Sequence, residues 1–133
     1  MTNETIRILA IDDNADIRDL LRFVLEKEGF EVSTSANGVD GLSQIKERRP
    51  DIVLLDVMMP EFSGFDVLDA IRNDKDSKVR VLPVLMITAK SSIEDVDRAL
   101  ELGATSYIVK PFRPTKLVEK VNELLALGQH QGV

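Results

Sequence analysis

The sequence predicts one α/β domain, built on a doubly wound parallel sheet of five strands that five helices flank. Two observations lead to this prediction: five short segments rich in Ile, Val and Leu recur along the chain, and segments with helical periodicity separate them. Continuous apolar strands are typical of a sheet covered on both faces, and strict alternation of strand and helix predicts βαβ units. The length of 133 residues suits a single domain.

The predicted strands are these apolar segments. They span residues 6–11, 30–35, 52–55, 81–87 and 106–109.

The predicted helices follow these strands, and each has an apolar stripe that repeats every three or four residues. The stripes are Ile17-Leu20-Leu21-Val24, Val39-Leu42-Ile45, Phe65-Leu68-Ile71, Val96-Ala99-Leu100 and Leu117-Val118-Val121-Leu124-Leu125. Ser91 and Glu94 predict a capping box at the start of the fourth helix, and Pro114 suits the first turn of the fifth. We expect that helix to leave a tail of six residues, 128–133.

Composition excludes several kinds of function. The chain has no cysteine, which rules out disulfides and thiolate metal sites, and its one histidine, His130, lies in the polar tail. A net charge of -6 argues against direct nucleic-acid binding. No apolar stretch reaches the ~18 residues of a membrane-spanning helix. The polar residues 1–5 give no signal peptide, so we expect a cytoplasmic protein.

Polar side chains stand where four of the predicted strands end. Asp12 and Asp13 follow the first strand, Asp56 the third, Thr88 the fourth and Lys110 the fifth. The carboxyl ends of parallel strands share one edge of the sheet, where doubly wound proteins bind their ligands. We therefore expect three carboxylates, a hydroxyl and an ammonium group to lie together at this edge.

This combination of groups suits phosphoryl transfer to a carboxylate. Neighbouring carboxylates repel one another unless a cation lies between them, and Mg²⁺ prefers such oxygen ligands. A carboxylate can also act as a nucleophile and form an acyl phosphate, whose charge a metal, an ammonium group and a hydroxyl stabilise. The prediction is Asp56 as nucleophile, Asp12 and Asp13 on Mg²⁺, Lys110 as counter-charge and Thr88 as the hydroxyl donor.

The residues around these side chains also carry a resemblance. The pieces are Ile11-Asp12-Asp13-Asn14, Leu55-Asp56-Val57-Met58-Met59-Pro60, Gly64, Thr88-Ala89 and Lys110-Pro111-Phe112. In this order and spacing the sequence resembles the receiver domain of bacterial response regulators over roughly residues 6–125. The resemblance implies a flavodoxin-like fold with strand order 2-1-3-4-5. It also implies that residues 1–133 form a single receiver domain, with no output domain in the chain.

The resemblance further implies how the site works. Asp56 is the residue that a partner histidine kinase or histidine phosphotransfer protein phosphorylates. Mg²⁺ is bound by Asp13, Asp56 and the backbone carbonyl of Met58, with Asp12 acting through water. Lys110 pairs with Asp56 and then with the phosphoryl group.

Signal output is likewise implied by the resemblance. Thr88 and Tyr107 form the switch pair, and the Lys110–Pro111 peptide bond is cis. The signal passes through the surface of the fourth helix, fifth strand and fifth helix. Such a domain is not a dedicated enzyme: we expect Mg²⁺-dependent self-phosphorylation from a phosphodonor and slow self-dephosphorylation. It is a monomer or a dimer that forms on phosphorylation.

Three alternatives compete with this prediction. A phosphatase of the haloacid dehalogenase type needs a second acid two residues after the nucleophile, where this chain has Met58. A flavodoxin-like carrier needs a phosphate loop after the first strand, where Asp12 and Asp13 would repel a flavin phosphate. The third alternative is a receiver fragment of a longer regulator with a DNA-binding or enzymatic output domain. The short tail and the negative charge favour a free-standing receiver.

Two further hypotheses concern residues outside the central group. Phe23 lies off the apolar stripe of the first helix and belongs to a docking patch for the phosphodonor protein, or is a scattered exposed residue. Lys90 and Met58 border the predicted site. We expect these two residues to tune the lifetime of the phosphorylated state.

Overall fold

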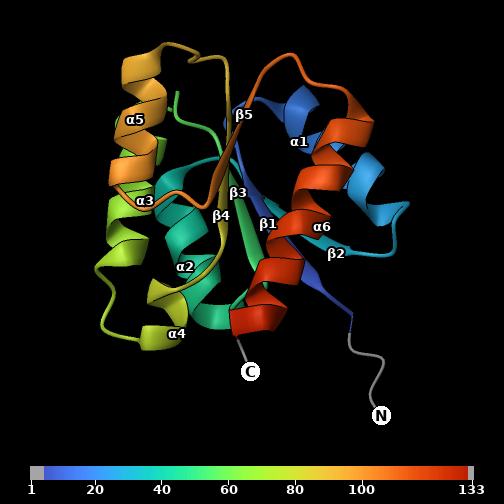
Figure 1. Ribbon diagram of the computed structural model, residues 1–133, viewed down its shortest axis with the longest axis horizontal. Coiled ribbons are helices and arrows are strands. Elements are labelled where there is room, and N and C mark those ends of the chain that lie inside the picture. The colour runs from blue at the N-terminus through green and yellow to red at the C-terminus, as the bar shows by residue number, and fades with distance from the viewer. Residues whose placement is uncertain (1–4, 132–133) are drawn as a thin grey trace.

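Five parallel strands form the centre of the molecule, in the order β2-β1-β3-β4-β5 (Figure 1). The computed structural model describes residues 5–131, and residues 128–131 by their backbone alone. The strands are β1 (Arg7–Ile11), β2 (Glu31–Ser35), β3 (Ile52–Leu55), β4 (Val84–Thr88) and β5 (Ser106–Val109). This confirms the predicted number, direction and order of the strands. Residues 1–4 and the side chain of His130 lie outside the described part.

Six helices cover the sheet in the described residues, one more than the sequence predicts. They are α1 (Ala15–Glu26), α2 (Gly38–Arg48), α3 (Gly64–Arg72), α4 (Ser77–Arg80), α5 (Ile93–Glu101) and α6 (Pro114–Gln131). In Figure 1, α1 and α6 lie on one face of the sheet, and α2, α3 and α5 lie on the other. The helix beginning at Pro114 continues through Gly128 to Gln131, so the predicted six-residue tail is wrong. No helix among the described residues meets the length and hydropathy that a membrane crossing requires.

Two hydrophobic cores, one on each face, follow from the alternation of side chains along the strands. On β1, Ile8 and Ala10 point to the α1/α6 face, while Leu9 and Ile11 point to the opposite face. The α1/α6 core includes Leu21, Leu25, Leu54, Ile87, Leu117 and Val121. The other core includes Ile45, Leu55, Leu68, Ile71, Met86 and Ala99. Because both faces are covered, the three central strands β1, β3 and β4 are almost completely buried, which explains their continuous apolar sequences. The edge strand β2 (Glu31-Val32-Ser33-Thr34-Ser35) is only partly buried, so the prediction of an apolar segment at 30–35 was wrong in composition though right in position.

Local features differ from the sequence predictions at several points. The fourth strand begins at Val84 rather than residue 81, because α4 and Pro83 come first. Val81 is the C-cap residue of α4 and is 68% exposed. Three stripe residues, Leu20, Val39 and Leu100, are exposed to solvent. The N-cap of α5 is Ser92, whose hydroxyl accepts the Asp95 N–H at 3.1 Å, so the predicted cap was one residue early.

Candidate functional site

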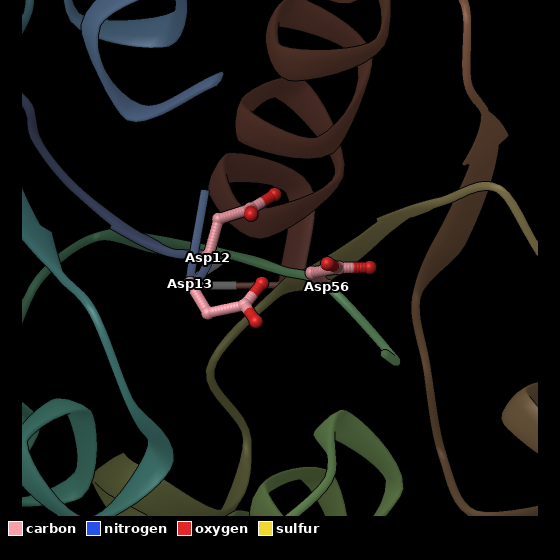
Figure 2. Close-up of side chains that lie close together, drawn as sticks. All are labelled: Asp12, Asp13 and Asp56. Atoms are coloured by element: carbon pink, nitrogen blue, oxygen red, sulfur yellow. The ribbon is translucent and has the colours of Figure 1, made fainter. Parts of the chain in front are cut away.

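Three carboxylates lie together at the carboxyl edge of the sheet, on the ends of two adjacent strands. Asp12 and Asp13 follow β1, and Asp56 follows β3 (Figure 2). One oxygen of each carboxylate lies within 4.8 Å of the other two. Asp12 is only 2% exposed and Asp56 only 5%, whereas Asp13 is exposed to solvent. The structure therefore brings together the three acids that the sequence selects.

Backbone hydrogen bonds hold these residues because the sheet ladder continues past the strand ends. The N–H of Asp12 donates to the carbonyl of Ser35 at 3.0 Å, and that of Asp56 donates to the carbonyl of Ile11 at 3.0 Å. After β3 the chain turns closely onto α3: a Cβ atom at Gly64 would lie 2.1 Å from the carbonyl oxygen of Asp56. Only glycine fits at this close approach, so Gly64 fixes the loop that carries Asp56.

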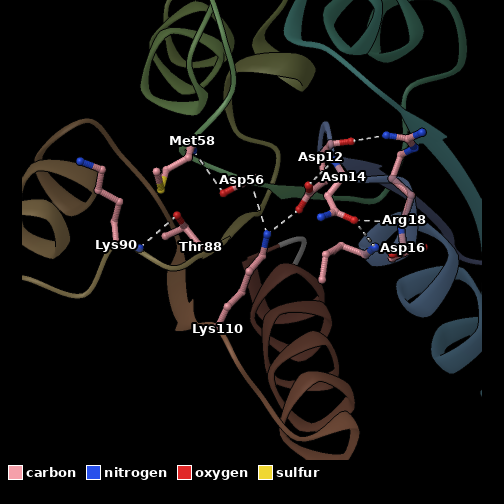
Figure 3. Close-up of polar contacts among 10 residues, drawn as sticks. Asp12, Asn14, Asp16, Arg18, Asp56, Met58, Thr88, Lys90 and Lys110 are labelled. Carbon is pink, nitrogen blue, oxygen red and sulfur yellow. Dashed lines mark hydrogen bonds and ion pairs between the residues drawn. The ribbon is translucent and has the colours of Figure 1, made fainter.

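Lys110 brings a positive charge into the acidic cluster from the end of β5 (Figure 3). Its ammonium group lies 2.8 Å from Oδ2 of Asp12 and 3.5 Å from Oδ2 of Asp56. Its backbone N–H donates to the carbonyl of Thr88 at 2.8 Å, and the Lys110–Pro111 peptide bond is cis. Lys110 thus contacts both buried acids and lies nearer to Asp12 than to Asp56, the partner that the resemblance implies.

Every polar group of Asp12 has a partner. Oδ1 accepts the N–H of Asn14 at 2.9 Å, and Oδ2 accepts the ammonium group of Lys110. The carbonyl of Asp12 accepts Nη1 of Arg18 at 2.8 Å, and its N–H is used by the ladder bond to Ser35. Asp12 is therefore a fixed element of the site, while the neighbouring Asp13 carboxylate lies open to solvent.

The surroundings of Asp56 make its ionised form less stable. Burial, and then the negative charge of Asp12, raise the pKa of Asp56 above its ordinary value of 3.8. The ammonium group of Lys110, the N–H of Met58 and the hydroxyl of Thr88 oppose this change, and the Met58 N–H donates to Oδ1 of Asp56 at 3.2 Å. Three carboxylates face one ammonium group, so negative charge is in excess. A hard divalent cation such as Mg²⁺ fits this donor set of carboxylate oxygens.

A second row of contacts leads from the site to β5. The side chain of Thr88 is buried, and its Oγ1 accepts the N–H of Lys90 at 3.3 Å (Figure 3). The hydroxyl of Tyr107 donates to the carbonyl of Lys90 at 2.6 Å, and its ring packs against the core formed with α3 and α5. Burial, followed by the charges of Asp95 and Asp56, raises the pKa of Tyr107. Both predicted switch residues, Thr88 and Tyr107, thus form a hydrogen bond with the backbone of Lys90.

Two surface grooves border helices of the domain, one beside α5 and one beside α1. One, of about 520 Å³, runs between the loop after β3 and α5, and its lining includes Met58, Met59, Phe65, Lys90 and Arg98. The other, of about 390 Å³, lies between α1 and α6, and its lining includes Leu20, Phe23, Lys27, Pro114 and Val118. Phe23 is 63% exposed, and the ammonium group of Lys27 lies 5.3 Å from the centre of its ring. The two residues singled out by the sequence as peripheral, Phe23 and Lys90, each border a groove.

The sequence predictions gave no role to Asn14, although it belongs to the motif Ile11-Asp12-Asp13-Asn14, and did not name Arg18. Asn14 is the N-cap of α1, and its side chain accepts the N–H groups of Asp16 and Ile17 at 2.8 and 3.2 Å. Arg18 lies just beyond the first turn of α1, six residues after Asp12. Its position in the sequence gave no signal of its contact with the Asp12 carbonyl.

Comparison with known proteins agrees with this geometry. The family model described as "Response regulator receiver domain" matches residues 8–122. The DNA-binding response regulator MtrA of Mycolicibacterium paratuberculosis is 42% identical over 119 residues, which cover 90% of this chain and 51% of that protein. The probable transcriptional regulator ycf27 of Porphyridium aerugineum is 40% identical, and the match covers 90% of this chain and 48% of that protein. The chain spans about half the length of the curated relatives it matches.

Solved structures give the same result. The chemotaxis response regulator CheY4 of Vibrio cholerae superimposes with a TM-score of 0.84 at 33% identity, covering 91% of this chain and 99% of that one. A receiver domain protein from Methanospirillum hungatei gives a TM-score of 0.88 at 32% identity, covering 96% and 99%. The chain therefore belongs to the response regulator receiver domain family.

Proposed function

We propose that this domain is a phosphoacceptor that receives a phosphoryl group on Asp56 from the phosphohistidine of a sensor kinase or phosphotransfer protein. The observation that carries the proposal is the position of Lys110, which contacts Asp12 at 2.8 Å and Asp56 at 3.5 Å inside a cluster of three carboxylates. Phosphoryl transfer is catalysed mainly by positioning and by charge stabilisation, and this arrangement supplies both.

The chemistry is the transfer of one phosphoryl group between two side chains. A carboxylate oxygen of Asp56 forms a bond to phosphorus while the P–N bond of the donor phosphohistidine breaks, and the imidazole leaves. The product is an acyl phosphate. Lys110 neutralises charge on the transferring group, and the Thr88 hydroxyl donates to one of its oxygens. The domain then loses the phosphoryl group slowly to water, so it acts as a signalling switch rather than as a dedicated enzyme.

Mg²⁺ is the cation that we propose for this site. Asp13, Asp56 and the backbone carbonyl of Met58 would bind it, with Asp12 acting through water. The solvent exposure of Asp13 and the complete set of partners around Asp12 support this division of roles. When bound, Mg²⁺ offsets the negative charge of the carboxylates and of the incoming phosphoryl group.

The output would pass through the surface formed by α5, β5 and α6. Thr88 and Tyr107 are proposed as the switch pair, because both contact Lys90 between the site and α5. Ala99 is the one fully buried residue of α5, so little apolar burial holds this helix in place. A movement of the Thr88 side chain can therefore shift α5 with little loss of packing free energy.

The α1/α6 groove is proposed as the docking surface for the phosphodonor protein. It contains Phe23 and is formed by α1 and α6, the helices that follow Asp12 and Lys110 in the chain. An exposed aromatic ring next to an apolar groove is typical of a binding hot spot. This proposal deepens the sequence hypothesis for Phe23.

A second candidate concerns the whole protein. Relatives such as MtrA are described as DNA-binding, and the matched residues cover only 51% of that protein, which favours a receiver that is one part of a longer regulator. CheY4, almost fully covered by this chain, favours a free-standing receiver instead. The length of the open reading frame separates these two candidates.

The proposed function is tested by incubating the protein with acetyl phosphate, with and without Mg²⁺, and measuring the intact mass. We expect one phosphoryl adduct that requires Mg²⁺. The adduct is absent from Asp56→Asn and forms much more slowly in Asp13→Asn. An unmodified protein, or an adduct that survives in Asp56→Asn, would overturn the proposal.

A further inference from the structure

The peptide group that joins Asp12 to Asp13 is held from α1. Nη1 of Arg18 donates to the carbonyl of Asp12 at 2.8 Å (Figure 3). Asp12 is buried, so this carbonyl has little access to water and needs a donor from the protein. The Asp12 N–H donates to Ser35 at 3.0 Å. The backbone of Asp12 is thus fixed on both sides, by β2 and by α1.

The hydrogen bond from Arg18 to the Asp12 carbonyl affects the orientation of both Asp12 and Asp13. The carbonyl of Asp12 lies in the planar peptide group whose orientation is set by ψ of Asp12 and φ of Asp13. These two torsions determine the relative directions in which the two side chains leave the backbone. The Asp12 carboxylate has its own contacts, to Asn14 and Lys110, but the exposed Asp13 side chain has no such burial to hold it.

The charge of Arg18 gives no reason for it to strengthen cation binding. A positive charge near the carboxylates offsets part of their excess negative charge in the absence of a cation, but it competes with a bound Mg²⁺. A favourable effect of Arg18 on the cation site must therefore come from its hydrogen bond. The hydrogen bond to the Asp12 carbonyl is suited to this role, since a charged donor to a buried carbonyl is among the stronger hydrogen bonds.

We propose that Arg18 is a positioning residue for the cation site, which orients Asp12 and Asp13 through the peptide group between them. The inference rests on the proposed function, because it assigns Arg18 a role toward the Mg²⁺ of that function. Partners that orient metal ligands typically contribute about tenfold or more to metal affinity. If Arg18 acts by positioning the two acids, its removal weakens Mg²⁺ binding. If it acts only through its positive charge, its removal makes Mg²⁺ binding tighter.

The test is calorimetric titration of Mg²⁺ into Arg18→Met, which keeps an aliphatic stem and removes the donor. We expect the dissociation constant to rise about tenfold, and Arg18→Lys to recover most of the affinity. Arg22→Met is the matched control, because it removes the same charge from α1 one turn further along, where Arg22 pairs with Glu26 at 3.6 Å. Its affinity should equal that of the parent. Equal or tighter binding in Arg18→Met would overturn the proposal.

A second measurement does not depend on Mg²⁺. In the metal-free protein, the Asn14 N–H donates to Oδ1 of Asp12, so its hydrogen exchange reports on the order of this turn. We expect exchange of the Asn14 amide to be faster in Arg18→Met, with core amides such as Leu54 unchanged. An unchanged Asn14 amide contradicts the proposal even if the parent binds no Mg²⁺. If Arg18→Met does not fold, Arg18→Gln takes its place in both measurements.

Discussion

The ammonium group of Lys110 lies 2.8 Å from Oδ2 of Asp12, although the two residues are 98 positions apart in the chain. The same group lies 3.5 Å from Asp56, and its side chain is largely buried. Lys110 therefore occupies the space between the two buried acids and neutralises part of their charge. In the proposed mechanism this position places a positive charge beside the oxygen that attacks the phosphoryl group.

Lys110→Met should lower the rate of phosphorylation by acetyl phosphate roughly 100-fold, the scale on which removal of one charge-stabilising donor acts. The same variant should bind Mg²⁺ more tightly, because a competing positive charge has left the cluster. The rate is measured from the growth of the adduct by mass spectrometry. Lys116→Met is the control: Lys116 is exposed and pairs with Glu119 at 3.6 Å, so its rate should match the parent. Equal rates in both variants would contradict the role of Lys110.

Asp56→Asn should be more stable than the parent at neutral pH without Mg²⁺. The pKa of Asp56 is raised by burial and by Asp12, so the fold disfavours its ionised form. A raised pKa gives stability that is present while the group is protonated and is lost as pH rises through that pKa. Thermal unfolding at pH 7 should therefore show a higher Tm for Asp56→Asn than for the parent.

The pH dependence provides the check on that prediction. The higher Tm of Asp56→Asn should approach that of the parent as pH falls toward 3.8, the ordinary pKa of the carboxyl group, because the parent side chain becomes protonated. Addition of Mg²⁺ should stabilise the parent more than the variant. A Tm difference that stays constant from neutral to acidic pH would show that charge is not its cause.

Phe23→Ala should slow phosphotransfer from a phosphorylated kinase about tenfold and leave phosphorylation by acetyl phosphate unchanged. The ring is largely exposed, so its removal should cost little stability but should remove a contact of the α1/α6 groove. Val39→Ala on α2 is the matched control, because Val39 is 70% exposed and lies on the opposite face of the sheet. A normal transfer rate in Phe23→Ala would remove the docking role.

Lys90→Glu and Met58→Asn should change the decay rate of the phosphorylated protein several-fold. Both residues line the groove beside Asp56, where the hydrolysing water must approach. Met58→Asn replaces an exposed apolar side chain by one that can orient water, so we expect faster decay. Lys90→Glu replaces a cation by an anion and should slow the approach of a hydroxide-like nucleophile. Decay rates equal to that of the parent in both variants would refute this role.

Much of the fold could be predicted because it depends on strong local patterns. The central strands follow from their apolar segments, and the sheet order follows from the resemblance; both agree with the structure. The short helix α4 was missed because it has four residues and one buried side chain, Val79, which gives no periodic signal. Val81 was assigned to a strand from its β-branched side chain, but Pro83 delays the start of β4.

The candidate site could be predicted in its residues but not in its contacts. The positions of Asp12, Asp56 and Lys110 at strand ends are visible in the sequence, because topology alone brings the strand ends together. Which acid Lys110 approaches more closely depends on side-chain torsions and on burial, which no local pattern reveals. The contact of Arg18 with a backbone carbonyl is hidden for the same reason: any residue has a carbonyl, and only folding shows which one is buried.

The most direct test of the account is to locate the phosphoryl group on the chain. The protein is treated with acetyl phosphate and Mg²⁺, and borohydride then reduces any aspartyl phosphate to homoserine, which peptide mass spectrometry can identify. We predict homoserine at position 56 alone, and none when Mg²⁺ is omitted. Homoserine at position 12 or 13, or its absence from every position, would contradict the role of Asp56 as the phosphoacceptor.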